Sequence, residues 1–344
     1  MNKYSEKLRG VLLVGSAPVS DAEEMFVMAI RHLNGYIKRL PDGEFGERDT
    51  WIRFQYARLL EAPQLTPSGE KPVYTPVSPI STINGISLAS QISIPNLGYA
   101  DAAINSYAVF KQMKNNGAIP INIRFQIGLP TPYSVATMYG HINIQEILEE
   151  AYKKALENEL TKILGAIPHE ELAIQWETVT EFAVLENIVN SYINEDKMNQ
   201  LTRRVSKLVD MLPNQVEAGI HLCYGDSGHK HFCEPMDSSY LVDFANGVAS
   251  HAKRTIEWLH LPVPKERADI EYYKPLSRLN LDNNTELYLG LVHMTGGLEG
   301  TKERVDAALG FVKHFGISTE CGLGRRSKET IPDLLNQHRA LVEI

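Results

Sequence analysis

Short apolar runs alternate with amphipathic helical patterns along most of this 344-residue chain. Apolar or β-branched runs of about four to eight residues are typical of buried strands, whereas apolar residues recurring every three or four positions indicate helices. The pattern predicts strands over 11–15, 36–40, 121–130, 171–177, 216–225, 253–259, 286–293 and 316–322. It predicts helices over 21–34, 142–164, 239–252, 301–315 and 330–344.

The alternation of strands and helices determines the expected fold class. Right-handed βαβ units built from such a pattern form a parallel sheet. Eight units over this length favour a closed (β/α)₈ barrel over an open sheet. No change in composition divides the chain, so residues 1–344 are expected to form a single (β/α)₈ barrel domain. The stretch 62–98, rich in Pro, Ser and Thr, is interpreted as an insertion over the barrel mouth after the second strand.

Composition and charge exclude several classes of partner. A net charge of -8 provides no basic surface for nucleic acid or for an anionic membrane. No apolar run approaches the roughly 20 residues that span a bilayer. Residues 1–18 are charged and then turn into a strand pattern, unlike a signal peptide. The chain has only three cysteines, which argues against a disulfide framework and for a reducing compartment. We therefore expect a cytoplasmic protein.

Polar side chains gather where the expected strands end. In a parallel barrel all carboxyl-terminal strand ends meet at one face, and that face carries the chemistry of such folds. These residues are Ser16, Asp42, Glu44, Glu177, His221, Cys223, Glu257, His293 and Cys321.

Among these residues, His221 and Cys223 suggest a metal site. Side chains two positions apart on a strand share one face, and imidazole and thiolate are preferred ligands of Zn²⁺. Two completions of the ligand set are open. A local one would use His229, His231 or Cys233 from the following loop, and a remote one would use Glu257 and Cys321. The remote set is favoured, because a barrel brings strand ends together, although Cys321 alone would be an ordinary buried thiol and Glu257 an ordinary buried acid.

The same residues carry a resemblance to a known family. HLCYGD (221–226) and ECGLGRR (320–326) resemble the His-x-Cys-Tyr and Asp-Cys-Gly-Leu-x-x-Arg motifs of cobalamin-independent methionine synthase. TIEWL (255–259) is similar to its Ile-Glu-Thr, and LGLVHMTGG (289–297) to its Ile-His-Ser-Pro stretch. Weaker similarities lie in VGSAP (14–18), GEFGERDTW (43–51) and IQWETVTE (174–181).

The resemblance implies a fold, a metal and roles for single residues. The catalytic half of the family is a (β/α)₈ barrel that binds zinc. The implied Zn²⁺ ligands are His221, Cys223, Glu257 and Cys321. Ser16, Glu44 and Glu177 match the positions that hold the carboxylate and amine of homocysteine, and His293 matches the active-site histidine. Methionine biosynthesis is the implied process.

The chain departs from the family on the side of the methyl donor. Its length is that of the catalytic half alone. Glu177-Thr178-Val179 stands where the family has Asp-Glu-Pro, and His293-Met294-Thr295 where it has His-Ser-Pro. The zinc motifs are thus kept, while the site for the donor differs.

The sequence therefore predicts a zinc-dependent thiol alkyl(methyl)transferase with two small-molecule partners, a thiol and an alkyl donor. The zinc-bound thiolate of homocysteine or a similar thiol would attack the donor, Glu257 would leave the metal, and His293 would protonate the leaving group. Three alternatives remain: a zinc enzyme that opens an epoxide with a thiol, a metal-free relative resembling uroporphyrinogen decarboxylase, and a non-catalytic zinc-binding protein built on the local loop. The metal-free alternative has no use for His221, Cys223 and Cys321 together. The donor, the thiol and the oligomeric state stay open.

Overall fold

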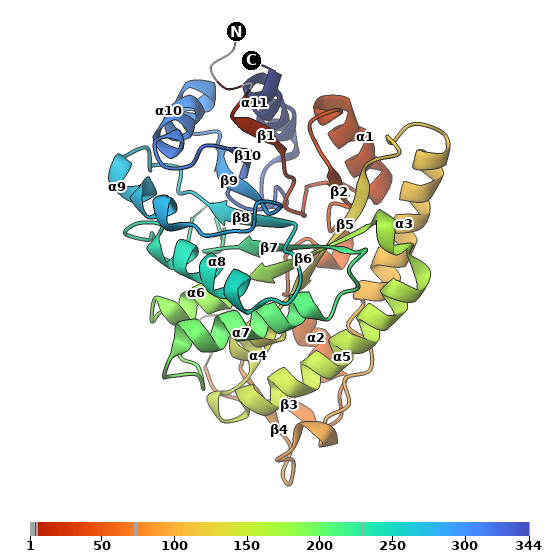
Figure 1. Cartoon of the computed structure of the whole chain (residues 1–344). Coiled ribbons are helices and arrows are strands. Elements are labelled where there is room, and N and C mark those ends of the chain that lie inside the picture. Colours follow the sequence, from red (N-terminus) through yellow and green to blue (C-terminus); the bar gives the residue numbers. More distant parts are fainter. Residues whose placement is uncertain (1–3, 5, 72–74, 229, 344) are drawn as a thin grey trace.

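Eight parallel strands form one curled sheet in the computed structural model, which describes residues 4, 6–71, 75–228 and 230–343 (Figure 1). The sheet has the order β1 (Leu8–Val11), β10 (Phe315–Thr319), β9 (Glu286–Val292), β8 (Trp258–Pro262), β7 (Glu217–Leu222), β6 (Leu172–Thr178), β5 (Arg124–Pro130) and β2 (Arg39–Pro41). The sheet's two edge strands, β1 and β2, lie beside each other. Two isolated parallel bridges, Val11 with Ile37 and Ser16 with Gly43, connect the segments in and next to these strands. The expected parallel sheet is confirmed, and the fold is TIM-barrel-like.

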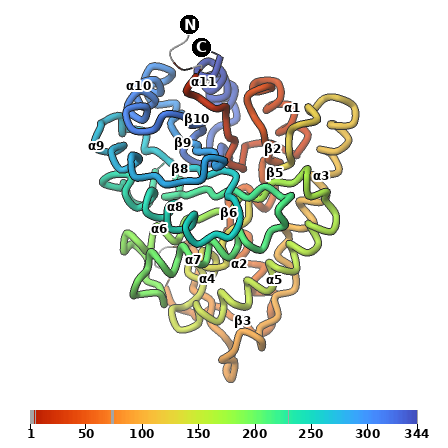
Figure 2. Tube along the Cα trace, in the orientation of Figure 1, coloured from red at the N-terminus to blue at the C-terminus, as the bar shows by residue number. Residues whose placement is uncertain are grey.

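Helices surround the sheet, each in contact with the next. In spatial order they are α11 (Ile331–Glu343), α1 (Ala22–Leu33), α3 (Tyr99–Asn115), α5 (Gln145–Ala166), α4 (Pro132–Tyr139), α6 (Thr180–Leu185), α7 (Lys197–Asp210), α8 (Ser239–His251), the 3₁₀ helix η5 (Lys274–Arg278), α9 (Ile270–Tyr273) and α10 (Gly297–Leu309). Since α10 packs on α11 again, the helices form a closed ring, with α11 beside β1 (Figure 2). No helix within the described ranges is long and apolar enough to cross a membrane.

The segment 62–98 has more regular structure than its sequence indicates. It contains β3 (Leu65–Pro67) and β4 (Ile80–Thr82), which pair antiparallel and lie at the end of the molecule away from β1 and α11 (Figure 1). The other short elements are α2 (Gln55–Leu60) and the 3₁₀ helices η1 (Gly46–Arg48), η2 (Ala89–Gln91), η3 (Ile142–Ile144), η4 (His169–Glu171) and η6 (Lys328–Thr330). Three-residue strands are too short to show a two-residue period, which explains why the sequence pattern misses them.

Helix α1 shows how local sequence fixes the ring. Asp21 caps its first turn by accepting a hydrogen bond at 2.8 Å from the backbone N–H of Glu24. Such a cap contributes on the order of 1 kcal/mol to helix stability. Met25, Phe26 and Leu33 are buried on the side of the helix that faces the sheet and its neighbours.

Large aromatic side chains fill the space that the curled sheet encloses. Trp258 and Tyr288 are almost fully buried with Leu12 and Ala173 in a cluster separate from the main core. A glycine stands against the first of these rings, because a Cβ at Gly219 would lie only 1.8 Å from Cε2 of Trp258. The interior is therefore a packed core and not a pore.

Two buried glutamines hold the chain that leads from β1 to the strand ends. Gln126 donates through Nε2 to the carbonyls of Leu13 (3.0 Å) and Val14 (2.9 Å). Gln175 donates to the same Val14 carbonyl at 2.7 Å. These bonds replace ladder bonds that the irregular end of β1 lacks, and they fix the position of Gly15 and Ser16.

Packing of Trp258 against Gly219 gives a first testable prediction. Gly219→Ala places a methyl group inside the indole ring, so we expect the free energy of unfolding to fall by roughly 1–3 kcal/mol. Gly165→Ala is the matched control, since its Cβ would meet nothing within 4 Å on helix α5. That substitution should raise the free energy of unfolding by about 0.5–1 kcal/mol. Urea denaturation of both variants measures the difference, and equal effects would contradict the packing described.

Candidate metal centre and substrate cavity

The side chains of His221, Cys223 and Cys321 meet at the carboxyl ends of β7 and β10. One ligand atom from each lies within 4.8 Å of the others, and the two sulfurs are 3.7 Å apart. His221 is fully buried, and its Nε2 has no hydrogen-bond partner in the described part of the chain. Two thiols and an imidazole with an unsatisfied nitrogen are a donor set that fits Zn²⁺. Of the two possible ligand sets, the structure thus supports the remote one as far as Cys321, which lies beside His221 and Cys223.

The local loop does not complete the set. His231 lies with Nδ1 3.1 Å from a carboxylate oxygen of Glu234, and Cys233 is a half-buried free thiol. Neither belongs to a group of potential ligands in the described ranges, where the three residues above form the group found. His229 lies outside the described residues.

The prediction that Glu257 ends a strand at the metal is wrong. Strand β8 begins one residue later, at Trp258, so Glu257 lies at the amino end of the sheet. Its carboxylate accepts hydrogen bonds from the guanidinium of Arg254 (3.1 Å) and from the backbone N–H of Ala218 (2.5 Å), near the start of β7. A carboxylate at the start of the strands cannot reach side chains at their ends, so the structure does not bring Glu257 together with His221, Cys223 and Cys321.

His260, which the sequence pattern did not single out, lies directly beside His221 of the candidate metal site. His260 is paired in register with His221 on the adjacent strand, and the Nδ1 atoms of the two rings are 2.6 Å apart. The other ring nitrogen of His260 is 3.0 Å from the carbonyl oxygen of Thr319. Burial lowers the pKa of His260 to about 3 and that of His221 well below its ordinary value, so both rings are neutral. The signal in the sequence that could have identified this residue is a single histidine within the apolar run WLHLPV (258–263).

Two carboxylates, from the buried Glu177 and the half-buried Glu44, lie next to the cysteines. A Cβ at Gly128 would lie 2.8 Å from Oε1 of Glu177 and 2.9 Å from Oε1 of Glu44, so both acids cover the same glycine. Burial raises the pKa of Glu44 to about 7. Burial, followed by the charge of Glu44, raises the pKa of Glu177 well above its ordinary value. A pair of acids that resists ionisation is a suitable partner for a cationic group such as a substrate amine.

Glycines also fit Ser16 tightly into this face. A Cβ at Gly322 would lie 2.2 Å from the Ser16 hydroxyl oxygen. The Ser16 carbonyl accepts a hydrogen bond at 2.6 Å from the N–H of Leu323. The sequence that follows Cys321 is thus glycine-rich because it passes directly over the end of β1.

The loop after β2 positions Glu44 in a strained conformation. The φ angle of Glu44 is +50°, in the left-handed region that non-glycine residues rarely adopt. Asp42 accepts a hydrogen bond at 3.0 Å from the Glu44 N–H and pairs with Arg48 at 2.7 Å. Asp42 therefore supports the loop, while the Glu44 carboxylate faces the cavity.

A single cavity of about 40 Å³ joins most of the residues that the sequence singled out. Its lining includes Ser16, Glu44, Glu177, Cys223, Cys321 and Arg325. His293 is not part of this lining. It is buried directly after the end of β9, with Nε2 2.9 Å from the Val263 carbonyl and Nδ1 3.7 Å from the carboxylate of Glu320. The thiol side of the site is therefore assembled around one cavity, and His293 belongs to a neighbouring group.

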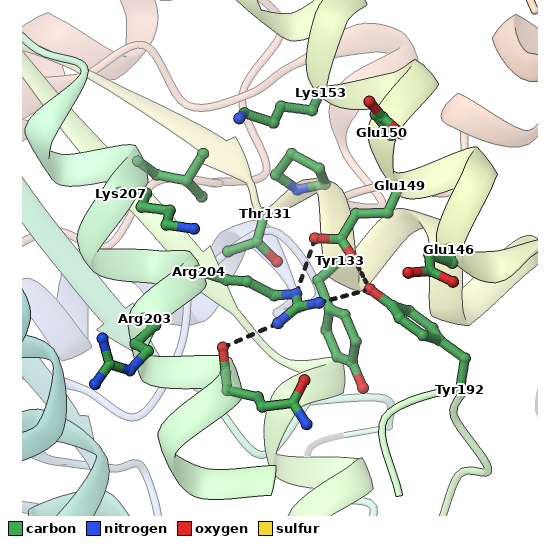
Figure 3. A pocket seen from close by; sticks show the side chains of 13 residues that line it. Thr131, Tyr133, Glu146, Glu149, Glu150, Lys153, Tyr192, Arg203, Arg204 and Lys207 are labelled. Carbon is green, nitrogen blue, oxygen red and sulfur yellow. Dashed lines mark hydrogen bonds and ion pairs between the residues drawn. The ribbon is translucent and has the colours of Figure 1, made fainter. Parts of the chain in front are cut away.

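A larger cleft of about 540 Å³ lies elsewhere, between α4, α5 and α7. Its central charges are paired with one another: Arg204 is 3.2 Å from Glu149 and 3.0 Å from the hydroxyl of Tyr192 (Figure 3). This internal pairing fits a structural ion-pair network between helices. We therefore regard the smaller cavity beside the cysteines as the functional one.

Comparison with known proteins supports the fold. No protein-family model and no curated protein matches this chain. Among solved structures, a B12-independent methionine synthase from Shewanella sp. W3-18-1, in complex with selenomethionine, is similar with a TM-score of 0.59 at 15% identity, over 98% of this chain and 97% of that one. A methyltransferase from Methanosarcina mazei gives a TM-score of 0.59 at 13% identity, over 98% and 94% of the two chains.

A third solved structure, also of a methionine synthase-like protein, is similar in fold. The putative vitamin-B12 independent methionine synthase from Listeria monocytogenes is similar with a TM-score of 0.53 at 13% identity, over 96% of this chain and 95% of that one. This chain thus has the fold of methionine synthase-like and methyltransferase-like enzymes over nearly its whole length.

The paired acids give a prediction about pH and stability in the metal-free protein. A carboxyl whose folded pKa is raised keeps its proton while the unfolded chain loses it, so its contribution to stability falls as the pH rises above about 4.5. Glu177→Gln removes one such group and keeps the acceptor for Gln175, which now bonds Glu177 at 2.8 Å. We expect the variant to melt at a higher temperature than the native protein at pH 8, with the difference vanishing near pH 4.5.

Calorimetry in the presence of a chelator measures this effect. Glu299→Gln is the control, because the Glu299 side chain is 80% exposed and should show no such trend. A native protein that is more stable than Glu177→Gln at pH 8 would contradict the buried acid pair.

Proposed function

We propose that this chain is a zinc-dependent transferase that alkylates, by default methylates, the thiol of homocysteine or a similar small amino-acid thiol. The observation that carries the proposal is the cluster of His221, Cys223 and Cys321, whose two cysteines line one cavity together with Glu44 and Glu177. Similarity in fold to methionine synthase-like and methyltransferase-like enzymes supports the reaction class. The Shewanella protein was solved in complex with selenomethionine, an amino acid similar in size to the thiol substrate that we propose for this chain.

The metal would be held by the two thiols and by the imidazole of His221. When bound, zinc would keep a substrate thiol deprotonated and nucleophilic at neutral pH. A three-residue ligand set leaves one position open for that thiol, as in other catalytic zinc sites. In this proposal no carboxylate ligand is needed, since Glu257 lies at the other end of the sheet.

The remaining cavity residues would bind the polar end of the substrate. Glu44 and Glu177 would accept hydrogen bonds from a cationic amine, whose charge would favour their ionised forms. Arg325 lines the same cavity and would pair with a carboxylate, with the Ser16 hydroxyl as a further donor. This arrangement selects a zwitterionic amino acid over a simple alkyl thiol.

His293 would serve the donor side. Its Nε2 is turned to the Val263 carbonyl, which leaves Nδ1 and the nearby Glu320 carboxyl to exchange a proton with a leaving group. Within this proposal residues 1–344 act as one (β/α)₈ barrel domain in the cytoplasm, with 62–98 as an insertion after the second strand. The small number of cysteines, three in the chain, favours a reducing compartment.

Metal content tests the proposed ligand set. We expect the purified protein to hold roughly one zinc per chain. Cys321→Ser should lose most of the metal, because it removes one of three ligands, whereas Cys233→Ser should keep it. Elemental analysis of both variants beside the native protein measures the outcome. The reverse pattern would show that the loop with His231 and Cys233 binds the metal.

A donor panel tests the reaction. With homocysteine as acceptor, we expect alkylation by at least one small methyl donor, but turnover below roughly 1 per second with methyl-tetrahydrofolate triglutamate. The reason is the departure of Glu177-Thr178-Val179 and His293-Met294-Thr295 from the family's motifs on the donor side, together with the position of His293 outside the cavity that the cysteines line. Faster turnover with the folate would show that the donor side is intact. Metal binding without turnover for any donor, including an epoxide, would favour a non-catalytic zinc protein.

A further inference from the structure

The Thr319 carbonyl, His260 and His221 form a continuous chain of hydrogen bonds that ends at the candidate metal site. The line runs from the Thr319 carbonyl to Nε2 of His260 (3.0 Å), and from Nδ1 of His260 to Nδ1 of His221 (2.6 Å). Both histidines are fully buried. Hydrogen bonds in such a dry environment are directional and costly to leave unmade.

The chemistry of the three groups fixes the position of each proton. A carbonyl oxygen only accepts, so Nε2 of His260 must carry a proton. A neutral imidazole carries one proton, so Nδ1 of His260 is an acceptor. Its contact with Nδ1 of His221 then requires the proton of His221 to lie on Nδ1. Nε2 of His221 is consequently bare, and it is the nitrogen with no partner in the described part of the chain.

The line also crosses the sheet between the two elements that supply the ligands. His221 is on β7 and His260 on β8, whereas Thr319 ends β10 two residues before Cys321. Strand β9 separates β8 from β10, and its Gly290 leaves room for the crossing, since a Cβ there would lie 3.0 Å from the Thr319 carbonyl oxygen. His260 thus links the histidine ligand to the segment that carries a cysteine ligand.

We propose that His260 is the positioning residue of the metal centre: it holds His221 in the tautomer with a bare Nε2 and keeps that ring in place relative to Cys321. This inference rests on the proposed zinc site. Partners that orient a metal-bound histidine typically contribute 10–100-fold to metal affinity. His260 touches neither substrate nor metal in this proposal and acts only through His221.

Zinc affinity of three variants tests the role. His260→Leu removes the acceptor for His221, and we expect its zinc affinity, measured by competition with a chromogenic chelator, to fall by about 10–100-fold. His260→Asn places a carbonyl oxygen where Nδ1 was, so it should bind zinc far more tightly than His260→Leu. His338→Leu is the matched control, because His338 is an equally buried histidine on α11, away from the cluster, and it should leave the affinity unchanged.

A second measurement needs neither metal nor a variant. In the ¹⁵N-histidine-labelled, metal-free protein, the proton of His221 should lie on Nδ1 and that of His260 on Nε2. A proton on Nε2 of His221, or native-like zinc affinity in a folded His260→Leu, would overturn the positioning role. If the native protein binds no zinc at all, the proposed function fails, while the labelled protein still decides whether the line of protons exists.

Discussion

The register of three neighbouring parallel strands is the constraint on which this site depends. Glu177 of β6 is aligned with His221 of β7, and His221 is aligned with His260 of β8. A slip by one residue in either pair would turn these side chains to the opposite face of the sheet. The aromatic layer beneath this row, with Trp258 against Gly219, opposes such a slip because only glycine fits there. Packing inside the sheet therefore sets the geometry of the chemistry at its end.

Placing these groups in a dry cavity has a cost that the surrounding residues offset only in part. Burial and the charge of Asp42 raise the pKa of Glu44, and burial and the charge of Glu44 raise the pKa of Glu177, so both carboxyls resist ionisation. His221 keeps a buried nitrogen without a partner in the described ranges. A native structure retains such unsatisfied groups chiefly where a ligand supplies the missing interactions. The cluster of His221, Cys223 and Cys321 thus offers donor atoms that suit a metal ion, and the acid pair offers acceptors that suit a cationic group.

Strand ends could be predicted from the sequence where polar residues follow long apolar runs, but not where a polar residue stands within one. The convergence of His221, Cys223 and Cys321 followed from this reasoning and agrees with the structure. The run TIEWLHLPVP led to an error, because the expected strand over 253–259 placed Glu257 near its carboxyl end, whereas β8 starts after that residue and continues through His260. A fully buried histidine breaks the apolar pattern, and its partner Thr319 lies on a distant strand, so only the fold reveals why it is tolerated.

The loop segment with His231 and Cys233 folds back on β7 instead of joining the cluster of potential metal ligands. Phe232 stacks on Tyr224 with ring centroids 5.5 Å apart, and its N–H donates to the Tyr224 carbonyl at 2.9 Å, which folds the loop back on the strand it follows. This fold buries His231, whose Nε2 comes to 3.6 Å from the carboxylate of Glu320. Glu320 in turn faces His293 and directly precedes Cys321. The loop therefore lies against Glu320, which also faces His293, and its described residues contribute no member to the cluster of His221, Cys223 and Cys321.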